Sequence, residues 1–405
     1  MRKFSFDFKK KQKEKPERQQ PMTAEGKRQM RRRRARRRVF IRSLIALLTC
    51  LTLVFVWQNW DWLAPDKLIA SITDWLTGGD GSYPVDLSGT NVQRLVRTED
   101  YTVLVTDSHV VYYDSEGAEM NRYHYAVSNS LVRTAGDYVL VAEQGGRRLH
   151  LSTRSDIELE FSTDHNILSV ALNEEGQIAV LTDGPQNYQI QVKVYDDEGK
   201  LLYTRSRNRT ATDVALSPDG KQVALLSVEA SDGDLNTYIE AFSLSSSANE
   251  ATYSHIEKDV LLYRLAYFSE NCIGTVAEDR VVILNAVTGG VHRYTLEDQH
   301  ILGYAIGEDR MAVAVRPYGD TADGTLVLLN GSGKAVKTAS FSGDFRQLSA
   351  FKNEFVVLTD RYVQKFSESG LGGKASVEAD GRQAVLDEDL AVVLGVSQLD
   401  AYELK

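Results

Sequence analysis

The residue types that most often carry out chemistry are scattered through this 405-residue chain and form no recognised catalytic pattern. No H-E-x-x-H zinc pair and no G-x-S-x-G nucleophile turn occurs. Cys272 stands alone in an apolar run, which is typical of a small core residue. The histidines are scattered, form no local pair of metal ligands and are predicted to be satisfied surface or strand residues. They are His109, His124, His150, His165, His255, His292 and His300. We therefore predict no catalytic residue, no cofactor and no metal site.

Two segments approach known ligand-binding loops but depart from them at essential positions. The glycine-rich stretch 369–376 resembles a phosphate-binding loop, yet Glu368 stands where the first glycine is required. The run Asp232–Asn236 has the alternating oxygen ligands of a calcium loop, but Thr237 replaces its glycine and Ser243 its bidentate glutamate. The phosphate-loop interpretation is therefore rejected, and the run Asp232–Asn236 is predicted to be a solvated loop between strands.

Short runs of Val, Leu, Ile and Tyr recur between turn signals from about residue 83 onwards, which is typical of buried β-strands. Many are followed by a second strand that ends in a polar turn with Gly or Asn, as hairpins require. The clearest runs are Thr102–Asp107, Asp137–Val141, Gln177–Asp183, Lys221–Leu226, Arg310–Val315, Phe355–Asp360 and Leu390–Leu394.

These strand pairs repeat about every 40 residues, the spacing of propeller blades. Units begin near residues 92, 129, 166, 211, 259, 300, 344 and 381. We predict an all-β propeller of about eight, alternatively seven, four-stranded blades. The last unit offers strands at Ala391–Val396 and Leu399–Leu404 but the chain then ends, so Tyr83–Leu87 is expected to complete that blade. Two packed β-sandwiches are the alternative.

One hairpin supports a family resemblance. The segment Leu216–Ala224 reads LSPDGKQVA and is similar to a hairpin of WD-like and TolB-like propellers. No Trp follows Trp75, so neither the Trp-Asp signature of true WD repeats nor the tryptophan docking motif of quinone-dependent dehydrogenases is present. With its basic tail and apolar segment, the chain resembles a family of single-pass, membrane-anchored propeller proteins of Gram-positive, clostridial-type bacteria. That resemblance implies an envelope location and no particular reaction.

The apolar segment before the repeats is predicted to be a transmembrane helix. Ser43–Trp57 carries no charge, but fifteen helical residues span only about 22 Å, less than the ~30 Å of a hydrocarbon core. Extension back to Val39 brings Arg42 inside the boundary, where its guanidinium can reach the headgroups. A cleaved signal peptide is the rival interpretation. Retention is favoured because the leader is long and the bulky Trp60–Leu63 follows instead of a small-residue cleavage site.

Charge sets the orientation of this helix. Residues 1–42 hold 18 basic and 4 acidic residues, whereas the rest of the chain holds 29 basic and 52 acidic residues, a net charge of −23. The positive-inside rule places the arginine run in the cytoplasm, beside anionic lipid headgroups. The run is Arg31, Arg32, Arg33, Arg34, Arg36, Arg37 and Arg38. The four tryptophans, Trp57, Trp60, Trp62 and Trp75, are expected to mark the outer interface.

The sequence thus predicts four parts: a basic cytoplasmic tail (1–38), a transmembrane helix (39–60), a juxtamembrane amphipathic helix with a glycine hinge (64–82) and an extracytoplasmic propeller (83–405). A binding or scaffolding module in the cell envelope is the leading hypothesis, because repeat folds offer large loop surfaces. An envelope protein or polymer is the expected ligand, and no nucleic acid is expected. A hydrolase or lyase acting on an envelope polymer, and a sensor that signals through the basic tail, are the alternatives.

Overall fold

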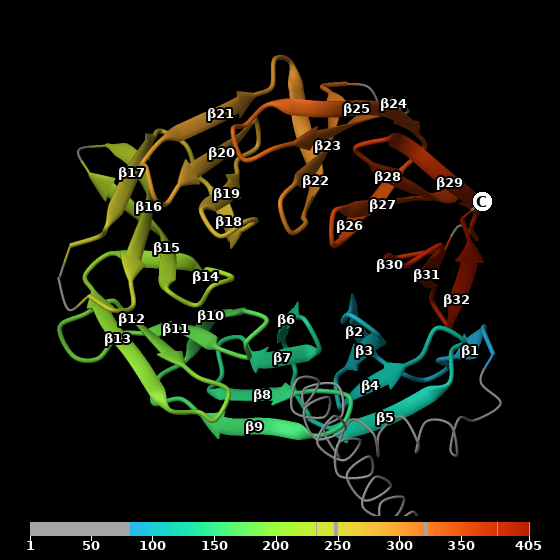
Figure 1. Cartoon of the computed structure of the whole chain (residues 1–405), viewed down its shortest axis with the longest axis horizontal. Helices are drawn as coiled ribbons and strands as arrows, with labels where there is room; N and C mark the ends of the chain where they lie inside the picture. Colours follow the sequence, from blue (N-terminus) through green and yellow to red (C-terminus); the bar gives the residue numbers. More distant parts are fainter. Residues whose placement is uncertain (1–81, 232, 247–249, 320–322, 379, 405) are drawn as a thin grey trace, which may run out of the picture. The chain divides into compact units, whose positions relative to one another are not determined.

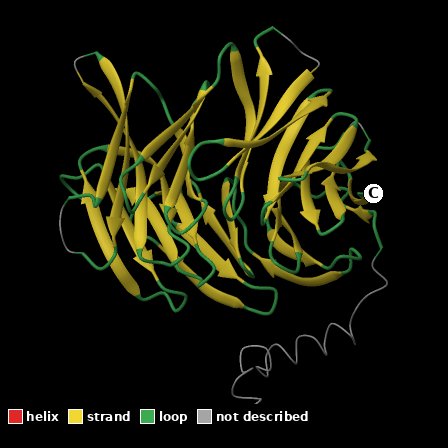
Figure 2. Ribbon diagram, turned by 45° about the horizontal axis from the view of Figure 1, so that its top comes forward, coloured by secondary structure: helices red, strands yellow, loops and turns green. Residues whose placement is uncertain are grey.

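The computed structural model describes residues 82–231, 233–246, 250–319, 323–378 and 380–404. In this part of the chain, eight antiparallel four-stranded sheets are arranged as blades around a common centre (Figure 1). Within the described residues, Figure 2 shows strands joined by loops and turns. The predicted eight-bladed all-β propeller is therefore confirmed.

The first four blades follow one another along the chain, and each runs outwards from its innermost strand. Blade 1 comprises β2 (Val92–Arg97), β3 (Thr102–Thr106), β4 (His109–Tyr113) and β5 (Glu119–His124). Blade 2 comprises β6 (Ser130–Ala135), β7 (Tyr138–Glu143), β8 (Arg148–Ser152) and β9 (Ile157–Ser162). Blade 3 comprises β10 (Ile167–Leu172), β11 (Ile178–Asp183), β12 (Ile190–Tyr195) and β13 (Leu201–Arg207). Blade 4 comprises β14 (Thr210–Leu216), β15 (Gln222–Ser231), β16 (Asp234–Ser243) and β17 (Tyr253–Lys258).

The next three blades repeat this order. Blade 5 comprises β18 (Tyr263–Tyr267), β19 (Cys272–Val276), β20 (Arg280–Asn285) and β21 (Val291–Thr295). Blade 6 comprises β22 (Gln299–Ile306), β23 (Met311–Pro317), β24 (Asp323–Leu329) and β25 (Ala335–Ser342). Blade 7 comprises β26 (Phe345–Phe351), β27 (Glu354–Thr359), β28 (Tyr362–Ser367) and β29 (Gly370–Ser376).

Blade 8 combines both ends of the propeller and closes the ring. Its strands are β30 (Gln383–Asp387), β31 (Leu390–Leu394), β32 (Gln398–Glu403) and, outermost, β1 (Val85–Asp86). Val85 pairs with Leu399, which confirms the prediction that the strand within Tyr83–Leu87 completes the last blade. The two C-terminal segments expected there are the second and third strands, and the innermost strand is Gln383–Asp387.

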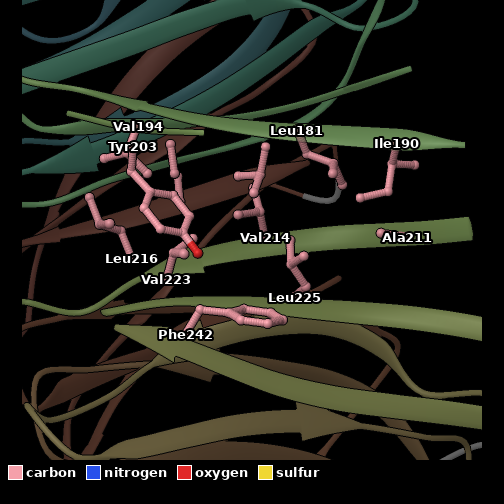
Figure 3. Close-up of a cluster of buried hydrophobic side chains, with 13 residues drawn as sticks. Leu181, Ile190, Val194, Tyr203, Ala211, Val214, Leu216, Val223, Leu225 and Phe242 are labelled. Atoms are coloured by element: carbon pink, nitrogen blue, oxygen red, sulfur yellow. The ribbon is translucent and has the colours of Figure 1, made fainter. Parts of the chain in front are cut away.

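The core consists of layers between neighbouring blades, not of one central core. Leu181 and Ile190 of blade 3 pack with Leu225 and Phe242 of blade 4 (Figure 3). Second strands are buried on both faces because alternate side chains enter different layers. In β7, for example, Val139 contacts blade 1 while Leu140 contacts blade 3. This arrangement explains the unbroken apolar runs in the sequence.

Six of the inner strands, β2, β10, β14, β18, β22 and β26, carry a register shift against their second strand. Such a bulge inserts one extra residue and re-aims neighbouring side chains. At four blade boundaries, a side chain of one inner strand accepts a hydrogen bond from a backbone N–H of the next inner strand. These bonds are Ser130 N to Gln93 (3.1 Å), Leu265 N to Asp213 (2.8 Å), Ala384 N to Gln347 (2.6 Å) and Leu95 N to Gln383 (2.9 Å).

The predicted transmembrane helix, juxtamembrane helix and tail lie outside the described residues. Within the described residues, no helix has the length and apolar character needed to cross a membrane.

Candidate functional site

A cavity of about 660 Å³ opens where the inner strands end. Seven of the eight blades line it, mainly through the last residues of their inner strands and the turns that follow. We call it the central cavity. The strand-end residues are Arg97, Ala135, Leu172, Leu216, Tyr267, Ile306 and Phe351.

The wall and the rim of the central cavity differ in chemistry. Leu172, Leu216 and Ile306 give an apolar wall, whereas the turns bring carboxylates to the rim. Lys352 neutralises one of these, Glu99, across 3.2 Å. Three others, Glu174, Glu270 and Glu308, form no ion pair with any described residue.

Charged side chains of opposite sign lie deeper in the ring, on the strands that form the wall. Arg133 directly precedes the wall residue Thr134, Asp213 lies three residues before Leu216, and Arg264 lies three residues before Tyr267. At about 3.3 Å per residue, these positions are ~3–10 Å further along their strands than the wall. Together with Arg94 and Tyr304, on β2 and β22, they form what we call the arginine cluster.

Electrostatic interactions show that this cluster converges from different blades. Enclosure by the surrounding strands and then the positive charge of Arg264 lower the pKa of Arg133 to about 10, and Arg94 acts in the same direction. Asp213 and Tyr304 act in the opposite direction. Arg133 and Arg264 belong to blades 2 and 5, so side chains far apart in sequence are close enough to influence each other's charge, while the Arg133 guanidinium itself donates to the Val132 carbonyl at 3.0 Å. Burial raises the pKa of Tyr304.

Asp213 is buried, and its carboxylate is held on several sides. It accepts hydrogen bonds from the Ser169 hydroxyl, the Leu265 N–H (2.8 Å) and the Val214 N–H (3.1 Å). The guanidinium of Arg264 lies 3.9 Å from it, at the limit of an ion pair. The carboxylate of Asp213 therefore mainly holds blades 3, 4 and 5 together. It offsets only part of the positive charge of the nearby arginines.

Arg264 is the extra residue of the bulge in β18 and adopts a positive φ of 67°. This left-handed conformation costs a non-glycine residue about 1–3 kcal/mol in strained sites, and such strain tends to occur where function requires it. The neighbours of Arg264 in this strand, Tyr263 and Leu265, are aromatic and apolar. Arg264 therefore introduces a long cationic side chain into an otherwise uncharged stretch.

The candidate motifs of the sequence lie away from the central cavity. Gly370–Ser376 forms β29, an outer strand. The prediction of a loop at Asp232–Asn236 is wrong from Asp234 onwards, because Asp234–Ser243 forms β16 and pairs with an extended β15 in a long hairpin. Cys272 is buried in β19, as expected of a core residue. The predicted interface residues, from Arg31 to Trp75, lie outside the described residues. Among the described residues, no group of three His, Cys, Asp or Glu side chains could hold a metal ion.

The sequence motifs did not reveal the arginine cluster, because its members lie on five different repeats. A usable signal was nevertheless present. Arg94, Arg133, Asp213 and Arg264 each place a charge within the first strand of a unit, where a buried strand should be apolar. A charge within the first strand of several repeats points to the axis of a propeller.

A family model covers most of the propeller. The model described as "Family of unknown function (DUF5711)" matches residues 82–380, well over half of the chain. The chain belongs to the DUF5711 family. Among curated proteins, no sequence matches this DUF5711 member.

Solved structures share the propeller architecture of this DUF5711 protein at low identity. A crystal structure of the eukaryotic initiation factor has a TM-score of 0.52 at 11% identity, covering 80% of this chain and 88% of its own. BamB from Moraxella catarrhalis has a TM-score of 0.47 at 11% identity, with 79% and 99% covered. AztD from Citrobacter koseri has a TM-score of 0.47 at 11% identity, with 70% and 86% covered. Similarity at this level concerns the fold alone.

Proposed function

We propose that this protein is a membrane-anchored binding module of the cell envelope, and that the central cavity of its extracytoplasmic propeller receives the ligand. The observation that carries the proposal is the cavity itself. Seven blades contribute to it, and it combines an apolar wall with a few charged groups, as ligand sites commonly do. The predicted helix at residues 39–60 and the arginine run before it support the location.

A photo-crosslinking residue on the rim tests both the site and the location. Glu270 is exposed and lines the cavity, so Glu270 is replaced by p-benzoylphenylalanine in the full chain, which is expressed in its own host. Irradiation of intact cells should give a discrete adduct. The matched control carries the same residue at Glu198, an exposed glutamate in the turn between β12 and β13, and should not give that adduct.

Two results would contradict the proposal. Identical adducts from the two positions would show non-specific contact with the surface. No adduct from Glu270, with the full-length protein present in the membrane fraction, would show that nothing in the envelope occupies the cavity.

A further inference from the structure

The arginine cluster has more positive charge than its surroundings neutralise. It contains three arginines and one carboxylate, and that carboxylate already accepts three hydrogen bonds from Ser169, Val214 and Leu265. Among the described residues, neither Arg94 nor Arg133 forms an ion pair, and the pair between Arg264 and Asp213 is long at 3.9 Å. A partly enclosed guanidinium without a counter-charge is unfavourable, so its retention calls for an explanation.

The position of the cluster contrasts with the rest of the molecule. After Arg42 the chain carries a net charge of −23, yet a positive group of side chains lies at the centre of its propeller. The strained backbone of Arg264 is a second and independent sign that this side chain is placed for a purpose other than packing. Guanidinium groups suit carboxylate and phosphate, because their planar donors match two oxygens at once.

The rim limits what else the ligand can carry. Glu174, Glu270 and Glu308 stand around the opening and form no ion pair with any described residue, although Lys221 is near enough to Glu270 to interact with its charge. A long polyanion would place charges against these carboxylates, and like charges repel. A ligand with one compact anionic end and a neutral or cationic body would satisfy both the deep cluster and the rim.

We infer that the central cavity binds a molecule by a compact terminal anion, a carboxylate or a phosphate, which Arg94, Arg133 and Arg264 hold while a neutral or cationic body lies between the apolar wall and the acidic rim. This inference rests on the proposed function, because it names the ligand class of the same cavity.

Paired probes test the inference on the full chain in lipid nanodiscs by calorimetric titration. The probes are the tripeptide Lys-Ala-Ala with a free carboxylate, the same peptide as its C-terminal amide, glycerol 3-phosphate, and long-chain polyphosphate. We expect the free acid or glycerol 3-phosphate to bind at least about tenfold more tightly than the amide, since charged hydrogen bonds are lost in the amide. Preference for the acid or for glycerol 3-phosphate tells the two anion sources apart. Polyphosphate should bind more weakly than either.

Arginine variants connect the anion preference to the cluster. Arg133→Gln and Arg264→Gln should abolish the difference between acid and amide, whereas Arg122→Gln, at an exposed ion pair on β5, should leave it unchanged. Cooperative thermal transitions at or above the melting temperature of the natural protein would show that the variants are folded. Anion-dependent stabilisation by inorganic phosphate, against chloride at equal ionic strength, gives a readout that needs no particular ligand body.

The inference would be overturned if amide and acid bound equally, if polyphosphate bound best, or if no anion bound or stabilised the protein. Crosslinking separates this outcome from failure of the proposed function. A Glu270 adduct that persists in the Arg133→Gln variant would leave the binding function intact and remove the anion inference. Loss of the adduct in that variant would support both.

Discussion

His150 is a fully buried histidine whose two ring nitrogens have no hydrogen-bond partner in the structure. Its ring stacks on Tyr125 at 4.8 Å between centroids, in the layer between blades 1 and 2. Burial lowers the pKa of His150 from its usual 6.5, although Glu160 acts in the opposite direction. The neutral imidazole therefore serves as a packing group here.

This burial predicts a loss of stability in acid. The unfolded chain binds a proton at His150 near pH 6.5, whereas the folded protein resists protonation until a lower pH. The contribution is complete above pH 6.5 and is lost as the pH falls below it. In His150→Leu, the free energy of unfolding should therefore fall less between pH 7 and pH 5 than in the natural protein, as measured by denaturant titration. His292→Leu, at an exposed position, is the control, and equal pH dependence in both variants would refute the prediction.

Chemistry at the residue scale was the least accessible to sequence reasoning. Charges in separate repeats meet only because the ring closes, so Arg133 and Arg264 could not be paired by spacing. His150 was interpreted as an ordinary surface or strand histidine, because a single sequence does not tell which face of a strand is covered by the next blade.

Strands were predictable where both faces are buried. The expected run Thr102–Asp107 corresponds to β3, and Leu390–Leu394 corresponds to β31. Inner strands were harder, because bulges and polar side chains disturb their pattern. The fifth unit was expected near residue 259, whereas β18 begins at Tyr263, after the long β15–β16 hairpin and a turn in which Asp259 has a positive φ.

The polar residues of the inner strands have a structural role that can be tested separately. Gln383 accepts the N–H of Leu95 from the neighbouring blade, and its own amide approaches the Gln93 carbonyl at 3.4 Å. Replacement by leucine would leave that backbone N–H unsatisfied, which costs about 1–3 kcal/mol. We expect Gln383→Leu to lower the free energy of unfolding by this amount.

Gln364→Leu is a suitable control for this effect, because the hydrogen bond of the Gln364 side chain among the described residues is a 3.4 Å contact with the Gly372 carbonyl of its own blade. Chemical denaturation of both variants gives the comparison. Equal stabilities would show that the bonds between inner strands contribute nothing beyond packing.

At the scale of the whole molecule, the ring is held closed between blade 8 and blade 1. Arg97 and Asp387 form a buried ion pair at 2.6 Å, with side chains only 6% and 5% exposed. Leu87 is buried beyond β1, and its N–H donates to the Ser397 carbonyl at 2.8 Å. This closure could be predicted from the sequence, because one strand precedes the first complete repeat and the last repeat lacks one strand.

Removal of β1 should open this closure. A chain that begins at Ser82 retains the strand and should be monomeric with a cooperative thermal transition. A chain that begins at Thr90 lacks it, exposes the edge of β32 and should melt lower and self-associate, because an unpaired edge strand templates pairing with other chains. Light scattering after size exclusion and thermal denaturation provide the measurements. Identical behaviour of the two chains would show that β1 is dispensable.

The pairing of β1 with β32 also fixes an order of events during synthesis. The ribosome produces β1 before every other strand of the propeller and β32 after all of them. Val85 can therefore pair with Leu399 only after the intervening chain has been synthesised. Blades 1 to 7 each consist of contiguous chain and can form as they emerge, whereas blade 8 can form only after β32 has emerged. The central cavity lies inside the ring, so its final shape is the last part of the propeller to be completed.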